Sequence, residues 1–306
     1  MAAFTAKDVQ ALREKTGVGM MDCKKALTAS DGDMEKAIEF LRERGLAAAA
    51  KKASRIAAEG IVDAYVTDNV GVLVEVNSET DFVAKNQSFK DYVAGVAKVV
   101  AEKDPADVAA LLAMKYDDSL TVEEMLREKI LTIGENLNIR RFERYTGKNV
   151  TYIHGGGKIG VMVNFDVDDA TAKNEEFITM GKDVAMQIAA LNPTFLSKET
   201  VPEDVIAKEK EINLAALKND PKNSKKPENI LVKIVEGKMG KYFEQTCLLQ
   251  QPFVKNGDQT VAQYVAEVEK KLGTKISIVK FARLEKGEGL QKREDNFADE
   301  VAGMVK

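Results

Sequence analysis

Gly71-Val72-Leu73-Val74-Glu75-Val76-Asn77 is a stretch that this chain contains twice, because Gly160-Val161-Met162-Val163-Asn164-Phe165-Asp166 repeats its pattern. Each copy leads into a second shared motif, which is Ala84-Lys85-Asn86 with Phe89 in the first copy and Ala172-Lys173-Asn174 with Phe177 in the second. The copies lie 89 residues apart in the apolar stretch and 88 apart in the second motif. One residue is therefore missing from the turn between the motifs, and the chain holds an internal duplication.

The turn between the two motifs differs between the copies. The first copy reads Thr80-Asp81-Phe82-Val83, whereas Ala170 or Thr171 stands in the second copy where the first has Phe82. Since the second copy folds without an aromatic side chain there, packing does not require one. Large side chains on rigidly held loops are common anchors of binding sites. We therefore interpret Asp81-Phe82 as a wedge directed at a partner. The alternative is that Phe82 folds back onto the sheet.

Composition excludes several classes of protein. The 306 residues suffice for two or three domains. Because 45 Lys and Arg stand against 49 Asp and Glu, we expect no direct nucleic-acid partner, which would require a basic face. Cys23 and Cys247 lie far apart without a CxxC motif, so neither a disulfide framework nor a zinc site is indicated. No export signal or apolar run of membrane-spanning length is present, and we expect a cytoplasmic protein without a membrane partner.

Hydrophobic periodicity and turn residues predict an α+β fold. The third of three short helices in residues 1–45 is expected to run from Asp33 to Arg44 and to end at Gly45, before an alanine-rich helical linker over 46–58. The first copy is then predicted to comprise strands at 60–66 and 70–76, a helix from about Val83 to Ala101, two helices within 105–133 and a strand at 138–145.

The second copy repeats this order but carries an insertion. We predict strands at 151–154 and 158–167, a helix ending near Ala190, a further strand at 246–249, a helix over 261–272 and a strand over 275–284. Two charged helices between Pro202 and about Tyr242 are expected to form an antiparallel hairpin, whose apolar stripe needs a cover. A last helix is expected from Phe297 to Val305.

Two long motifs identify a family resemblance: Thr16-Gly17-Val18-Gly19-Met20-Met21-Asp22-Cys23-Lys24-Lys25-Ala26-Leu27, and the run from Glu75 to Asn86. Together with His154-Gly155, Gln251-Pro252-Phe253 and Asp295-Asn296-Phe297-Ala298, they resemble the bacterial translation elongation factor Ts family over nearly the whole chain. The resemblance implies a guanine nucleotide exchange factor that binds elongation factor Tu and accelerates GDP release, with no cofactor and no covalent reaction.

The resemblance also implies a domain order: a ubiquitin-associated-like three-helix domain with its linker at 1–55, α/β subdomains at 56–146 and 147–285, a helical hairpin inserted at about 200–243, and a C-terminal helical module at 286–306. It implies partner contacts at Arg13, Met20, Met21, Thr80, Asp81, Phe82, Val83, His154 and Phe297. From the residues alone, one of Met20 and Met21 could fill the small helical core, Asp22 could cap the second helix, and Cys23 is expected to be buried and apolar.

The residues give little support to an enzymatic site. His154 is the only histidine, and no set of nucleophile, histidine and acid can be assembled around it. Gly155-Gly156-Gly157-Lys158 lacks the Walker pattern, since Tyr152 and Ile159 occupy its outer positions, so a glycine turn is the favoured interpretation. The rival hypothesis is a module that sequesters or stabilises its partner, and a nucleotide-converting enzyme is the third. A homodimer and a two-to-two complex with the partner both stay open.

Overall fold

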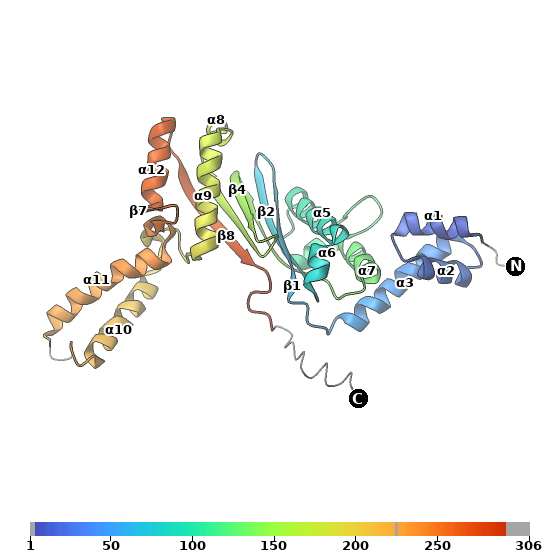
Figure 1. The fold of residues 1–306 in the computed structure, drawn as a ribbon, viewed down its shortest axis with the longest axis horizontal. Coiled ribbons are helices and arrows are strands. Elements are labelled where there is room, and N and C mark those ends of the chain that lie inside the picture. The colour runs from blue at the N-terminus through green and yellow to red at the C-terminus, as the bar shows by residue number, and fades with distance from the viewer. Residues whose placement is uncertain (1–3, 224–225, 292–306) are drawn as a thin grey trace.

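Two three-stranded antiparallel sheets form the centre of the molecule (Figure 1). This computed structural model describes residues 4–223 and 226–291. One sheet has the order β1-β2-β3 and the other β4-β5-β8. Their inner faces meet through Val62, Leu73, Met162, Ala282 and Leu284. The strands are β1 (Glu59–Val66), β2 (Val70–Ser78), β3 (Asn138–Thr146), β4 (Lys148–His154), β5 (Ile159–Asp166) and β8 (Ser277–Glu285).

Helices cover the outer face of each sheet. Strand residues alternate in direction, so the apolar side chains of β2 that face away from the other sheet pack on α5 (Gln87–Lys103). The first sheet is also covered by α4 (Asp81–Lys85), α6 (Val108–Ala113) and α7 (Val122–Ile133). The second sheet is covered by α8 (Asp169–Ala172), α9 (Glu175–Leu191) and α12 (Val261–Leu272), beside the short strands β6 (Pro252–Phe253) and β7 (Asn256–Thr260).

The repeated sequence falls on equivalent elements of the two sheets. In both, the central strand has a register shift at the same place, after Glu75 in β2 and after Asn164 in β5. The helices α4 and α8 hold the same place in the two copies, so the exposed Phe82 corresponds to the exposed Ala170 and the buried Val83 to the buried Thr171. The predicted helix over 83–101 is in fact two helices, because Asn86 is extended and its side chain caps α5.

The N-terminal module consists of α1 (Ala6–Thr16), α2 (Met20–Ala29) and α3 (Met34–Lys52). The predicted end of the third helix at Gly45 is wrong, since α3 continues for seven further residues, to Lys52. Gly45 is buried, and a side chain there would lie 3.6 Å from the Arg127 carbonyl oxygen of α7. The packing of α3 on α7 therefore outweighs the tendency of glycine to end helices, which costs only about 1 kcal/mol in a helix interior.

The inserted hairpin consists of α10 (Glu203–Asn219) and α11 (Glu228–Thr246) and projects at the end of the molecule opposite the N-terminal module (Figure 1). The expectation that its apolar stripe needs another cover is largely wrong, because the two helices bury Leu217, Leu231, Val235 and Met239 between them. The predicted strand at 246–249 is also wrong: α11 reaches Thr246, and Leu248–Gln250 forms a 3-10 turn.

No helix in the described ranges is both long and apolar enough to cross a membrane. The predicted helix from Phe297 to Val305 lies outside the described residues.

Candidate partner-binding site

Phe82 lies on the one-turn helix α4 and points into solvent. Its neighbours Val83 and Ala84 are buried in the core of the first sheet, whereas Phe82 is 79% exposed. Successive helical residues point about 100° apart, so burying those two neighbours turns Phe82 outward. The structure therefore does not have Phe82 folded back onto the sheet.

A charged pair borders the exposed ring. Lys85 Nζ donates to Asp81 Oδ2 over 2.6 Å, one helical turn away, and lies 5.8 Å from the centre of the Phe82 ring. This hydrogen bond lowers the pKa of the Asp81 carboxyl, which is exposed. The pair offers a partner both a cation and an anion beside an apolar anchor.

A hollow of about 410 Å³ brings two motifs that are far apart in the sequence to one place. Thr16, the last residue of α1, and Gly17, in the loop before α2, line it together with Phe82 and Val83, and α7 forms another wall. Met20 and Met21 begin α2, close to this loop, and are 53% and 66% exposed. The small core of the module excludes both methionines and consists mainly of Val9, Leu12, Val18, Cys23, Ala26, Leu27, Ala37 and Leu41.

The structure also places Arg13, Asp22 and Cys23 of the N-terminal module. Arg13 is exposed on α1. Asp22 does not cap α2; it accepts a 2.7 Å hydrogen bond from Arg44 Nη1 of α3. Cys23 is buried, and burial raises the pKa of its thiol, so it is an unreactive core residue.

Thr80 is held by a residue far away in the sequence. Its N–H donates to Glu135 Oε2 over 3.0 Å and its hydroxyl donates to Glu135 Oε1 over 2.6 Å. Thr80 and Val83 are thus engaged within the fold, on either side of the exposed Asp81 and Phe82.

His154 lies apart from the Phe82 hollow, at the exposed end of β4. Its Nδ1 is 2.9 Å from the Tyr152 hydroxyl. Gly155, Gly156 and Gly157 follow with φ of 59°, 66° and 98°, as a tight turn into β5 requires. In the described part of the chain, no group of three or more His, Cys, Asp and Glu side chains is arranged to hold a metal ion. Phe297 lies outside the described residues.

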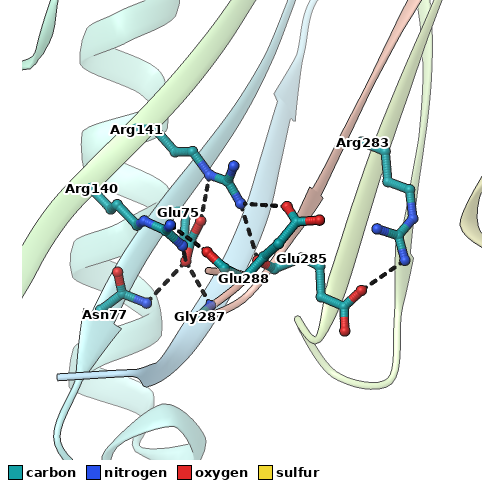
Figure 2. Close-up of polar contacts among 8 residues, drawn as sticks. All are labelled: Glu75, Asn77, Arg140, Arg141, Arg283, Glu285, Gly287 and Glu288. Carbon is teal, nitrogen blue, oxygen red and sulfur yellow. Dashed lines mark hydrogen bonds and ion pairs between the residues drawn. The ribbon is translucent and has the colours of Figure 1, made fainter. Parts of the chain in front are cut away.

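Sequence reasoning missed a buried charge cluster around Glu75, shown in Figure 2. The Glu75 side chain has no exposed surface, and its carboxylate accepts hydrogen bonds from Arg140 (3.0 Å), Arg141 (2.6 Å), Asn77 (3.0 Å) and the Gly287 N–H (2.8 Å). Burial alone would raise the pKa of Glu75, but these hydrogen bonds outweigh burial and lower it. The available signal was a carboxylate inside an apolar strand, with two arginines in a neighbouring strand.

The cluster fastens the segment after β8 to the first sheet. Arg141 donates to the Glu285 carbonyl over 3.1 Å and pairs with Glu288 at 3.2 Å, while Arg140 donates to the Glu288 carbonyl (Figure 2). In the second sheet, Asn164 takes the place of Glu75 and binds neutral groups such as the Thr146 carbonyl oxygen at 2.8 Å. The charged anchor is therefore specific to the first copy.

Comparison with known proteins now gives the family. The sequence pattern of the family Elongation factor TS matches residues 79–288. Elongation factor Ts of Clostridium perfringens (strain 13 / Type A) is 51% identical over 98% of this chain and 99% of its own length. Those of Trichlorobacter lovleyi and Clostridioides difficile (strain 630) are 49% and 48% identical, over 99% and 100% of both chains. The chain belongs to the elongation factor Ts family, whose members are translation factors.

Proposed function

We propose that this chain is a guanine nucleotide exchange factor that binds elongation factor Tu and accelerates GDP release during translation elongation. Family membership supports the partner. The site rests on the exposure of Phe82. This side chain is 79% exposed on α4, whereas the corresponding helix α8 bears Ala170. An exposed aromatic that the fold does not need is suited to entering a partner.

Exchange by such a factor requires no acid, base or covalent step. The factor binds the partner in a conformation that holds GDP and magnesium poorly, and by linkage the nucleotide weakens the hold of the factor on its partner. Phe82, with Asp81 beside it, would enter an apolar gap of the partner and displace the elements around the magnesium and phosphate site. The buried Val83 and the bound Thr80 support this role, because a wedge must be rigid to displace its target.

Further contacts would brace the same complex. We assign Arg13, Met20 and Met21 to the partner's nucleotide-binding domain, and the exposed methionines suit an adaptable protein surface. His154 lies on the second subdomain and would contact a different domain of the partner. Phe297 would contribute a contact from the C-terminal module.

The domain order is part of the proposal: a ubiquitin-associated-like domain at 1–55, duplicated α/β subdomains at 56–146 and 147–285 with the hairpin inserted at about 200–243, and a C-terminal module at 286–306. We further propose that the protein acts in the cytoplasm, without direct contact to nucleic acid, and that it forms a homodimer or a two-to-two complex with its partner.

The direct test is to mix the chain with elongation factor Tu that carries labelled GDP and to follow the release of the label. We expect substoichiometric amounts to accelerate release while the nucleotide stays chemically unchanged. Release proportional to complex formation, without turnover, would favour a sequestering module, and conversion of the nucleotide would indicate an enzyme.

A further inference from the structure

We propose that Glu135 is a positioning residue for Phe82: it fixes the start of α4 and so sets the direction of the exposed ring. This inference rests on the proposed role of Phe82 in exchange. Glu135 uses both carboxylate oxygens on Thr80, the residue directly before α4, at 3.0 and 2.6 Å. One bond holds the Thr80 backbone and the other its side chain, so Thr80 can neither shift nor rotate freely.

A reciprocal contact strengthens this attachment. The Asn136 N–H donates to Glu79 Oε1 over 2.6 Å, and Asn136 Nδ2 donates to the Arg55 carbonyl over 2.8 Å. The Glu135 side chain thus holds the backbone of Thr80. In return, the Glu79 side chain holds the backbone of Asn136. Gly134, with φ of 88°, ends α7 and lets the chain turn toward Thr80.

The second copy shows that a short helix at this place can be capped locally. Asp168 there accepts hydrogen bonds from the N–H groups of Ala170 and Thr171, both at 2.9 Å, and from the Thr171 hydroxyl at 2.8 Å. In α4, by contrast, no side chain of the described residues caps the first turn. The Thr80 hydroxyl, at the position where it could cap the helix, makes no capping bond to α4 and donates to Glu135.

As a consequence, the position of α4 is set by its attachment to the end of α7 and not by a cap of its own. Residues of α7, among them Glu128, Lys129 and Thr132, line the same hollow as Phe82. The N-terminal module packs on α7 through Gly45 and Leu131. Glu135 therefore holds Phe82 in a fixed relation to the surface that presents Met20 and Met21.

The test measures GDP release with Glu135→Ala and Glu135→Gln in the full-length chain. We expect Glu135→Ala to slow release about five- to tenfold, as for a misplaced contact group. Glu135→Gln should restore most of the rate, because its amide oxygen accepts from the Thr80 N–H and its amide nitrogen donates to the Thr80 hydroxyl. Glu123→Ala is the matched control, since this α7 carboxylate pairs with Arg127 on its own helix.

A double-mutant cycle distinguishes positioning from general support. In a Phe82→Ala background, Glu135→Ala should have little further effect on release, because the group that it positions is gone. An equal slowing in both backgrounds would overturn the proposal and make Glu135 a structural residue.

A second readout needs no partner protein. The chain contains no tryptophan, so Phe82→Trp introduces a single tryptophan as the reporter at the exposed position. We expect its time-resolved anisotropy to show more local motion when Glu135→Ala is added, and little change with Glu123→Ala. Unchanged anisotropy would contradict the proposal. If the wild-type chain fails to accelerate GDP release while this change in motion is seen, the proposed function fails and the positioning contact stands.

Discussion

At the scale of single residues, consecutive side chains of one sequence motif have different environments in the fold. Thr80, Asp81, Phe82 and Val83 are consecutive, yet the first is bound to Glu135, the middle two are exposed and the last is buried. The exposed part of this segment is therefore the Phe82 ring and Asp81, which pairs with Lys85. The motif predicted a functional segment, but packing decides which of its residues are buried and which are exposed.

We expect Phe82→Ala to slow GDP release at least about tenfold, a loss of about 1.4 kcal/mol of transition-state stabilisation. Because Phe82 is 79% exposed, the unfolding midpoint should stay nearly unchanged. Stopped-flow release and thermal unfolding measure the two effects. Val254→Ala, an exposed apolar position on the second subdomain, is the control and should alter neither. Normal GDP release with an unfolding midpoint several degrees lower would show that Phe82 contributes to stability and not to exchange.

At the scale of elements, α3 shows how a helix can continue through a glycine. Gly45 lies in a helix interior, where glycine costs about 1 kcal/mol relative to alanine. Gly45 packs against α7. A Cβ added there would lie 3.6 Å from the Arg127 carbonyl oxygen, which is an ordinary contact distance.

Gly45→Ala should therefore stabilise the protein by about 0.5–1 kcal/mol, measured by urea unfolding. Gly237→Ala, in the open interior of α11, is the matched control and should give a similar gain if propensity alone decides. Gly45→Val should instead destabilise, since the larger side chain separates α3 from α7. A loss of stability in Gly45→Ala would show that the two helices leave no room for a methyl group.

The hairpin is a second element with a separable role. Since α10 and α11 bury their own apolar stripe, we expect replacement of residues 206–239 by a short Gly-Ser link to leave the rest folded. GDP release should stay largely intact, because the hairpin lies at the end of the molecule opposite the N-terminal module. Sedimentation should show less self-association, since Ile212, Ile230 and Val232 remain exposed on it. Complete loss of exchange in a folded deletion variant, with the same assembly state, would place the hairpin in the exchange surface.

At the scale of the whole molecule, the Glu75 cluster joins segments that are far apart in the sequence. It connects β2 and β3 with the Gly287 segment that follows β8. Gly287 has a φ of 69°, and a side chain there would meet the Ala58 carbonyl oxygen at 2.2 Å, so glycine is required at this close approach. The cluster thus holds the segment that follows β8 against the first sheet.

This cluster predicts a pH dependence of stability. The folded pKa of Glu75 lies below its ordinary value of 4.5, so its stabilisation is present above that pH and is lost as the pH falls through the folded pKa. At about pH 7, Glu75→Gln should cost about 3 kcal/mol, since it leaves two arginines without their buried partner. The difference in unfolding free energy between wild type and Glu75→Gln should shrink as the pH falls below 4.5. A difference that stays constant would show that the carboxylate charge contributes nothing.

The sequence by itself determined the α+β class, the family, the duplicated strand and helix units, the N-terminal helices, the hairpin and the segment that bears Phe82. These follow from patterns between near neighbours: apolar periodicity, caps and turn residues. Only the tertiary structure decided that α3 passes through Gly45, that the hairpin covers its own stripe, and that Glu75 and Thr80 are bound by residues 65 and 55 positions away. Such contacts depend on how elements pack in three dimensions, and no local pattern of residues encodes which distant charge meets which.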